Sequence, residues 1–455
     1  MIGVRTLGLL AFAGLLVGCG ESGGTAADSF DATAKKRSKW VTAEISEHNA
    51  WLSDEIREEK YKEMAESPLA FLRGTNHLYW ADFADDSDLD DFGGGKSTRT
   101  FLQGDLHVGN FGSFHDDEGR VVFDVNDYDE AVVGDYQLDL WRGAVSIALL
   151  AEQQGLDEDE SEDAVRAFAE SYLDACESFV GSDDEEDRSV TADTAEGALA
   201  DFLSEVESKK TRAKMLSKWT TVSDGERRLA DDNEDLGPVD PEVQEALLAA
   251  LPDYGATLSG GLDWDEAYFA PKDVALRLHA GVGSLGVPRY YLLIEGPSAS
   301  LDDDVLLDIK LTPLPTGLAY LEDRSGFAID AERAVAGQKA LLTDTDNHLG
   351  WLELEDGSYA VRERSPFKED FPLEDIEDAE VLRALAAQMG AILAADHARA
   401  DRDYDDDILP ASLEEGVVDA VDGERSKFSD RVWKVASSYA GQVEKDYKAF
   451  LSMIE

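Results

Sequence analysis

The period of the hydrophobic pattern changes twice along the chain, and this change constrains the fold more than any other feature of the sequence. Apolar residues recur at helical spacing in DLWRGAVSIALLAEQQ, residues 139–154, and in DAVRAFAESYLDACESFV, residues 163–180. From residue 266 the chain alternates apolar and polar residues and breaks at glycines, and helical spacing returns from residue 375. The pattern predicts an α+β protein with a mainly helical lobe and a small antiparallel β lobe.

These changes of period divide the folded part of the chain into three regions. We assign residues 46–265 to a helical lobe that carries a catalytic loop, and residues 266–365 to a β-rich lobe. Residues 366–455 are expected to form C-terminal helices that pack on the helical lobe. This expectation rests on the last helix, where one stripe of apolar and small residues runs from Trp433 to Phe450.

The N-terminus, MIGVRTLGLLAFAGLLVGCGESGG, places one Arg before a short apolar run that ends in small residues. This pattern is typical of a secretory signal, and the run is too short and too rich in Gly for a good membrane span. Its end resembles a bacterial lipobox, which implies cleavage of a signal peptide, residues 1–18, and lipidation of Cys19. An ordinary signal with a chance Cys is the alternative. Residues 19–45 would then be a polar tether, and the protein would be anchored in the cell envelope by lipid alone, facing outside the cytoplasm.

The charge balance is strongly acidic, with 41 basic and 98 acidic residues and a formal net charge of −57. Such a chain repels nucleic acid and anionic lipid, so neither is an expected partner. An acidic excess keeps a folded protein soluble where salt screens its self-repulsion, so we interpret the surface as halophilic. Disordered acidic loops are the other interpretation of runs such as DEDESED, residues 157–163.

A glycine-bounded loop and a following acidic strand carry the chemistry that the sequence predicts. The loop is GDLHVGN, and the strand VVFDV with its continuation NDYDE follows after the turn DDEGR. Two strands joined by a short turn bring their ends together, so we expect Asp105 and Asn110 to face Asp124 and Asp127. Carboxylate and carboxamide oxygens suit Mg²⁺, and a carboxylate left off the metal can accept a hydroxyl proton. The arrangement favours metal-assisted phosphoryl transfer to a hydroxyl.

GDLHVGN, VVFDVND and VGDYQLDL resemble the catalytic core of aminoglycoside and choline kinase-like phosphotransferases. The resemblance implies that Asp105 is the catalytic carboxylate and that Asn110 and Asp124 bind metal. It also implies that Asp139 braces the loop and that His107 packs or hydrogen bonds in it. Asp127 either helps at a second metal or caps a turn.

The chain as a whole resembles the bacterial domain-of-unknown-function family numbered 2252. The matching stretches include SPLAFLRG, FDVNDYDEAVVGDYQLDLWR, GVGSLGVPRYYLLIEG and SSYAGQVEKDYKAF, and they run from about residue 60 to 450. The chain departs from the family at IKLTP, where a K-E-A type motif is usual, and at Arg362-Glu363, where R-Q is usual. These departures concern substrate details more than fold.

A second motif lies in the β-rich region, where Gly281, Gly283 and Gly286 form G-x-G-x-x-G. A dinucleotide-binding fingerprint needs a helix after the glycines, whereas RYYLLIEG favours a strand. Strand, glycines and strand form the phosphate-covering hairpin of kinases. The resemblance makes Lys310, in VLLDIKL, the lysine that pairs with the phosphates of ATP, and Glu332 the candidate ion-pair partner of that lysine. An edge-strand solubility residue and a solvated first-turn Glu are the structural alternatives.

The order of the two motifs is reversed relative to an ordinary kinase, because the glycine hairpin follows the catalytic loop instead of preceding it. A circular permutation reconciles both motifs, and the rival explanation is that one of them is coincidental. The leading hypothesis is therefore an exported, lipid-anchored, Mg²⁺- and ATP-dependent phosphotransferase with a circularly permuted kinase-like fold and an unknown hydroxyl acceptor. The alternatives are a kinase-fold protein that binds a ligand without turnover, and a metal-dependent hydrolase that uses Asp105, His107, Asp124 and Asp127.

Overall fold

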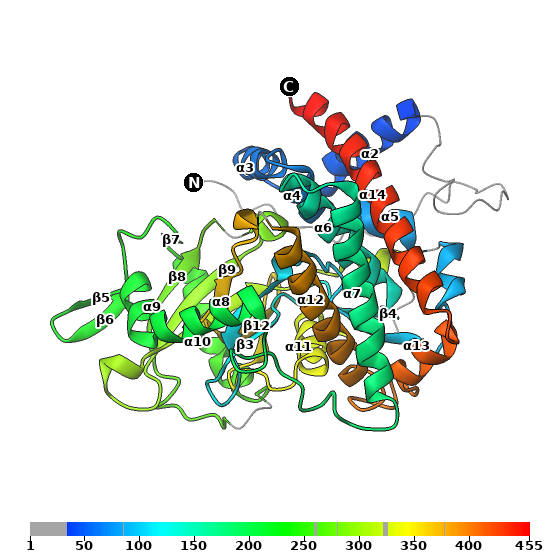
Figure 1. Cartoon of the computed structure of the whole chain (residues 1–455). Coiled ribbons are helices and arrows are strands. Elements are labelled where there is room, and N and C mark those ends of the chain that lie inside the picture. The colour runs from blue at the N-terminus through cyan, green and yellow to red at the C-terminus, as the bar shows by residue number, and fades with distance from the viewer. Residues whose placement is uncertain (1–33, 85, 259–261, 280, 322–325, 377) are drawn as a thin grey trace.

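The computed structural model describes residues 34–455 apart from residues 85, 259–261, 280, 322–325 and 377 (Figure 1). The predicted signal peptide, Cys19 and most of the predicted tether lie outside the described residues. Within them, no helix is long and apolar enough to cross a membrane. The described chain is a mixed α+β structure, and every strand pairing in it is antiparallel.

The largest described sheet has six strands in the order β11-β12-β10-β9-β8-β7. Its strands are β7 (Leu236–Gly237), β8 (Pro271–Arg277), β9 (Arg289–Ile294), β10 (Val305–Leu311), β11 (Gly350–Leu354) and β12 (Gly357–Glu363). Helix α11 (Asp330–Leu341) connects β10 to β11. This sheet is the β-rich region that the alternating pattern predicts.

Alternate residues of β9 enter two different cores, as the period of a strand requires. Leu292 and Ile294 pack in one core with α10 (Pro241–Gly255). Tyr291 and Leu293 pack in the other with α9 (Arg212–Trp219). The two helices therefore cover opposite faces of the sheet, and the part of the chain that builds this sheet and its cover begins well before residue 266.

Only part of the second face of the sheet is covered by α9. Leu306 of β10 packs in the core that α9 shares, and Asp308 and Lys310 follow at intervals of two on the same face. Asp308 and Lys310 line a pocket instead of this core. Strand alternation therefore puts Lys310 on the side of the sheet that faces the rest of the molecule.

Four long helices build the main core of the helical part: α6 (Gln137–Gln153), α7 (Glu158–Phe179), α12 (Ala379–Arg399) and α14 (Arg425–Ile454). Helix α7 contacts the other three, and Figure 1 shows it between α12 and α14. Helix α7 begins with a capping box, because Asp157 accepts from the Glu160 backbone N–H and Glu160 accepts in return. Almost every residue of α6 is buried, so this helix lies in the interior.

Shorter helices surround this core. They are α2 (Ala34–His48), α3 (Asp54–Met64), α4 (Pro68–Arg73), α5 (Asn76–Phe83), α8 (Gly197–Lys209) and α13 (Leu413–Val421). Arg37 ties α2 to the rest, because its guanidinium is 2.6 Å from Asp82 and 2.7 Å from Asp446. Helices α3 and α4 both contact the glycine segment between β8 and β9.

Three small sheets complete the described strands. They pair β1 (Arg99–Leu102) with β4 (Val132–Asp135), β5 (Thr220–Ser223) with β6 (Glu226–Leu229), and β2 (Phe111–His115) with both β3 (Val121–Val125) and β13 (Glu369–Asp370). Strands β2 and β3 form the hairpin that follows the glycine-bounded loop, residues 104–110. After β12 the chain runs directly onto this hairpin, where Glu369 pairs with Ser113.

The C-terminal end of α12 meets the strand that leads into the catalytic loop. The Phe101 N–H donates to the Ala400 carbonyl at 3.2 Å, and the Thr100 hydroxyl donates to the His397 carbonyl at 2.8 Å. Segments that lie 297 positions apart in the chain are therefore hydrogen bonded. The last turn of α12 ends where β1 begins to run toward Asp105.

Candidate active site

The glycine-bounded loop, residues 104–110, is held in shape by backbone hydrogen bonds to Asp139. The Asp139 carboxylate accepts from the N–H groups of Gln103 at 2.6 Å and Gly104 at 3.0 Å. Gly104 has φ +85°, and a Cβ at this position would overlap the backbone oxygen of Glu130. The loop therefore needs Gly104 for its backbone conformation. Asp139 braces the loop, which is the role that the resemblance to kinase-like phosphotransferases implies.

Asp105 is mostly buried and faces a large cleft. Its carboxylate forms an ion pair with the buried Arg142, whose guanidinium also donates to the Leu72 carbonyl at 3.1 Å. Burial raises the pKa of the Asp105 carboxyl to about 6, although the positive charge of Arg142 opposes the shift. A carboxylate with a pKa near neutrality is suited to accept a proton.

His107 and Asn110 connect the loop to itself and to the next strand. The His107 ring accepts from the Gly109 N–H at 3.1 Å, and burial holds the pKa of His107 well below its usual value. The Asn110 side-chain amide donates to the Asp105 carbonyl at 3.2 Å. His107 is thus a neutral packing residue, and the amide oxygen is the end of Asn110 that is left for a ligand.

Lys310 links the β-rich part of the molecule to the acidic segment NDYDE, residues 126–130. Its Nζ lies 3.4 Å from both carboxylate oxygens of Asp127 and also forms an ion pair with Asp129. Burial alone would raise the pKa of Asp127, but Lys310 and other nearby cations outweigh burial and hold this pKa below its usual value. Asp127 is therefore ionised, and two segments 183 positions apart in the sequence share one site.

Asp124 does not face this site, which corrects the expectation that it binds metal beside Asn110. In β3, Phe123 and Val125 enter the main core, so Asp124 points to the other side of the strand. There it lines a separate small pocket and hydrogen bonds to Asp396. Asp127, which follows the end of the strand, lines the cleft together with Asn110.

The three glycines lie between β8 and β9, in the order strand, glycines, strand that the sequence predicts. Gly281 and Gly283 line the cleft. Gly286 has φ +86°, and a Cβ there would overlap the Leu52 side chain. Gly286 therefore permits the turn and the close approach of the N-terminal helices, while the first two glycines leave open backbone beside the cleft.

Glu332 is not the partner of Lys310, which corrects a second expectation. Among the described residues, the ion-pair partners of Lys310 are Asp127 and Asp129. The residues of α11 that line the pocket of Lys310 are Ala334, Val335 and Gln338. Helix α11 forms in the segment that the sequence predicts, but the face that it turns toward Lys310 does not carry Glu332.

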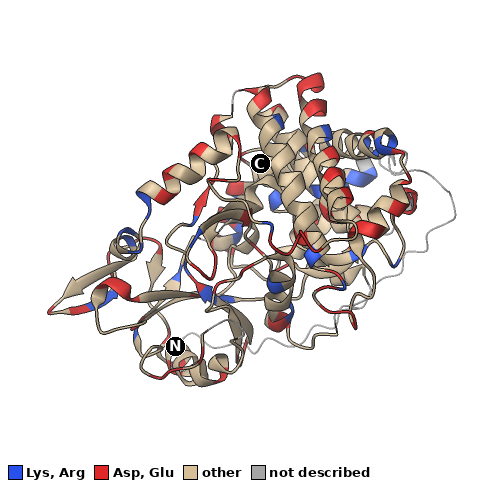
Figure 2. Ribbon diagram, turned by 60° about the horizontal axis from the view of Figure 1, so that its bottom comes forward, with Lys and Arg blue, Asp and Glu red and all other residues tan. Residues whose placement is uncertain are grey.

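The cleft that Asp105, Asn110, Asp127 and the first two glycines line has a volume of about 380 Å³. Its acidic side chains are Asp105, Asp127, Asp129, Glu130 and Asp370. Its Lys and Arg side chains are Lys60, Arg73, Arg277, Arg289, Arg364 and Lys368. Figure 2 shows acidic residues spread along the helices and loops of the molecule. The cleft therefore concentrates cations in a chain whose net charge is −57.

A match to a family model covers residues 53–453 and carries the description "Uncharacterized protein conserved in bacteria (DUF2252)". The chain belongs to the DUF2252 family. The searches found no similar curated protein and no similar solved structure. The range matched by the DUF2252 model contains the catalytic loop, the glycine hairpin and the helices α3 and α4.

Sequence reasoning named none of the six Lys and Arg side chains of this DUF2252 cleft, among them Lys60 and Arg73. Lys60 lies four residues from both Ile56 and Met64, so it occupies the inner stripe of α3 among residues that face the protein. A lysine at helical spacing between two apolar residues is a signal that the pattern of α3 contains. Arg73 is the last residue of α4, and nothing in its local pattern marks it.

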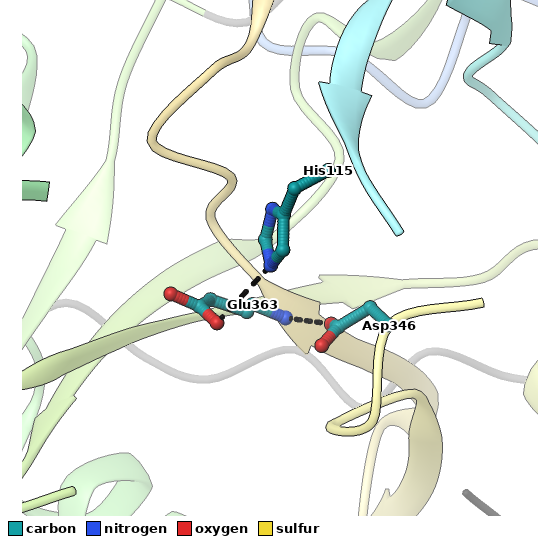
Figure 3. Close-up of side chains that lie close together, drawn as sticks. All are labelled: His115, Asp346 and Glu363. Carbon is teal, nitrogen blue, oxygen red and sulfur yellow. Dashed lines mark hydrogen bonds and ion pairs between the residues drawn. The ribbon is translucent and has the colours of Figure 1, made fainter. Parts of the chain in front are cut away.

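A second group of titratable side chains joins the β-rich part to the catalytic hairpin (Figure 3). His115 of β2 lies 3.4 Å from Glu363 of β12, and Asp346 lies 2.9 Å from His348. One ligand atom from each of His115, Asp346 and Glu363 lies within 4.8 Å of the others, a spacing that could hold a metal ion. Arg212 also forms an ion pair with Glu363, at 2.5 Å. We interpret the group as an ion-pair network, because each carboxylate already has a cationic or ionisable partner.

Proposed function

We propose that this protein is a kinase-like phosphotransferase that moves a phosphoryl group from a nucleotide such as ATP to a hydroxyl acceptor. The observation that carries the proposal is that Asp105, Asn110, Asp127 and the glycine hairpin line one cleft, while Lys310 contacts Asp127 from the adjoining pocket. Each supplies a part that phosphoryl transfer needs: a proton acceptor, metal ligands, a phosphate-binding lysine and open backbone over the phosphates. We further propose that the protein is exported and lipid-anchored through Cys19, on the outer side of the membrane.

The order of elements around Lys310 supports a kinase-like fold. In protein kinases a glycine-rich hairpin is followed by a strand that carries the phosphate-binding lysine and then by a helix. Here β8, the glycines and β9 are followed by β10 with Lys310 and then by α11. The departure is that α11 offers no carboxylate to the lysine among the described residues, and Asp127 and Asp129 hold it instead.

The contact between α12 and β1 supports a circular permutation. Because Ala400 accepts a hydrogen bond from Phe101, the end of α12 lies where the catalytic segment starts. A chain that joined these two points would run from the glycine hairpin through α11 and α12 into the catalytic loop. That is the order of an ordinary kinase, with the glycine hairpin before the catalytic loop.

The residues of the cleft define the proposed chemistry. The acceptor oxygen forms a bond to the terminal phosphorus of the donor, the bond from that phosphorus to the bridging oxygen breaks, and the hydroxyl proton passes to Asp105. Asn110 and Asp127 offer the oxygen ligands that Mg²⁺ prefers, and the ion would neutralise phosphate charge when bound. Arg142 fixes the orientation of the Asp105 carboxylate through their ion pair. Lys310 and the glycine backbone would hold the donor phosphates.

The position of Lys310 also separates this proposal from the metal-dependent hydrolase. A hydrolase built on Asp105, His107, Asp124 and Asp127 requires Asp124 in the acidic site and gives no role to Lys310. Asp124 lies outside the cleft, whereas Lys310 contacts Asp127. A protein that binds a nucleotide without turnover keeps the same cleft, and measured consumption of nucleotide distinguishes it from the phosphotransferase.

Thermal unfolding of the purified protein in molar salt tests the proposal. Mg²⁺ with ATP or GTP is expected to raise the Tm of the wild type, because a ligand that binds only the native state stabilises it by mass action. Lys310→Ala and Asp127→Ala are expected to reduce the rise. Glu332→Ala is the matched control and should keep it. The absence of a nucleotide-dependent rise in the folded wild type would reject the nucleotide site.

A further inference from the structure

Four cations in the cleft have no carboxylate partner among the described residues. Of the six Lys and Arg side chains there, Arg277 is paired with Asp235 at 3.2 Å, and Arg289 is paired with Asp308. The remaining four are Lys60, Arg73, Arg364 and Lys368. In a chain with 98 acidic and 41 basic residues, cations without a partner in one cleft are unexpected.

Lys60 is the most deeply buried of these four unpaired cations. It is 4% exposed, lies on the inner face of α3 and lines the cleft, with no ion pair or side-chain hydrogen bond among the described residues. An unpaired charge at a buried position is costly unless another group compensates it. Burial lowers the pKa of Lys60 to about 8, with the nearby charges of Asp105 and Glu130 opposing the shift. The amine is therefore still mainly protonated at pH 7.

Arg73 lies on the same side of the cleft, next to the catalytic loop. The carbon of its guanidinium is 3.5 Å from the place that a Cβ on Gly109 would occupy, so the cationic head sits over the loop. Its Nε is buried and has no hydrogen-bond partner among the described residues. Arg73 also contributes to the electrostatic environment of Asp105. Two unpaired cations from α3 and α4 thus lie beside the proposed proton acceptor.

Lys368 acts on the proposed metal-binding carboxylate. With Lys310, its positive charge helps hold the pKa of Asp127 low, although burial and the nearby charges of Arg362, Arg364 and Arg289 lower the pKa of Lys368 to about 7. Helices α3 and α4, which carry Lys60 and Arg73, contact the glycine segment. The charges of both side chains act on Asp105, where the acceptor hydroxyl must be placed to lose its proton.

We propose that Lys60 and Arg73 form a subsite for an oxyanion group of the acceptor, so that the substrate is an anionic hydroxyl compound and not a neutral one. This inference rests on the proposed phosphotransferase function, which fixes Asp105 as the acceptor end of the cleft. An ammonium and a guanidinium that converge from two helices suit phosphate or carboxylate oxygens, and the guanidinium offers several donors in one plane. The cluster also explains why an otherwise acidic molecule would not repel such a substrate.

Binding of inorganic phosphate, followed by ³¹P NMR line broadening in molar sodium chloride without nucleotide or Mg²⁺, tests the subsite. The wild type is expected to bind phosphate, and Lys60→Gln to bind it about tenfold more weakly, as loss of a charge-assisted hydrogen bond predicts. Lys62→Gln is the matched control, since Lys62 is exposed on the same helix, and its affinity should equal that of the wild type. Equal affinity of Lys60→Gln and Lys62→Gln, or no binding by the wild type, would overturn the subsite.

A second measurement separates the acceptor subsite from the donor site. Lys310→Ala is expected to keep phosphate binding at the subsite while losing the Tm rise with Mg²⁺ and ATP. Lys60→Gln is expected to keep that Tm rise while losing phosphate binding. If Lys60→Gln removed the nucleotide effect as well, Lys60 would belong to the donor site and the assignment of an anionic acceptor would be wrong. Phosphate binding that survives without any nucleotide effect would leave the oxyanion subsite but remove the phosphotransferase.

Discussion

At the residue scale, burial and neighbouring charges give the carboxylates of the cleft different properties. Asp105 has its pKa raised to about 6 by burial, whereas the cations around Asp127 hold the pKa of that residue low. In the proposed mechanism, such a pair of environments separates the proton acceptor from the metal ligand, because one carboxylate can take up a proton near neutral pH and the other remains ionised.

The rate of nucleotide consumption is expected to rise with pH through about 6. The carboxyl of Asp105 must be ionised to accept a proton, so activity is lost as pH falls below its pKa. Asp105→Asn is expected to lower kcat by about 10²–10⁴-fold while the nucleotide-induced Tm rise stays, because the base acts in the chemical step. ADP release measured from pH 5 to 8 checks both points. A pH-independent rate, or full activity of Asp105→Asn, would exclude Asp105 as the base.

Gly104→Ala is expected to destabilise the protein more than Gly119→Ala. Both glycines have positive φ, +85° and +83°, so each substitution carries a left-handed backbone cost of about 1–2 kcal/mol. Only at Gly104 would the new Cβ overlap the Glu130 oxygen, whereas at Gly119 it meets open space. The overlap adds roughly 1–3 kcal/mol. Denaturant unfolding of both variants measures the difference, and equal losses would show that the loop is not closely packed.

At the element scale, the ion-pair network of Figure 3 joins β2 to the β-rich part of the molecule. Burial would lower the pKa of His115 and His348, but Glu363 and Asp346 outweigh it, so both pKa values are raised. A raised histidine pKa gives stability that is present below the unfolded value of about 6.5 and is lost as pH rises through the folded value. The ion pairs that join β2 to β12 should therefore weaken above neutral pH.

The free energy of unfolding is expected to fall between pH 6 and pH 8, and to fall less in His115→Gln. Other groups, such as Glu130 with a pKa of about 7, titrate in the same range, so the difference between the two proteins is the relevant quantity. Denaturant unfolding at both pH values provides it. An unchanged difference between wild type and His115→Gln across this range would mean that the charged form of His115 contributes nothing to the connection.

At the scale of the whole molecule, the net charge of −57 opposes the compact state through self-repulsion. Salt screens that repulsion, with a Debye length that falls from about 10 Å at 0.1 M to about 3 Å at 1 M. The Tm is therefore expected to rise with sodium chloride over this range. A Tm that does not respond to sodium chloride would contradict a surface adapted to salt, and a matched series in sucrose controls for general stabilisation.

Local patterns allowed the sequence to predict the elements of this protein. The bracing role of Asp139 was implied by the resemblance to kinase-like phosphotransferases. The strand alternation from residue 266 predicted the sheet, and the glycines predicted the turn between β8 and β9. These features depend on neighbours a few residues away, so the sequence determines them directly. The sequence did not predict the full extent of the sheet. Strand β7 and the two helices that cover the sheet, α9 and α10, come from a region whose own pattern is helical.

The tertiary structure alone decided which side chains share the cleft. Asp124 and Asp127 are equally acidic in sequence, but strand alternation against the main core turns Asp124 away and leaves Asp127 beside Lys310. Lys60 lines the cleft because it lies on the face of α3 that is turned toward the protein interior. Contacts of this kind join segments far apart in the chain, and their geometry follows from how whole elements pack. The sequence by itself determined the DUF2252 family and the α+β class, while packing determined which side chains share the cleft.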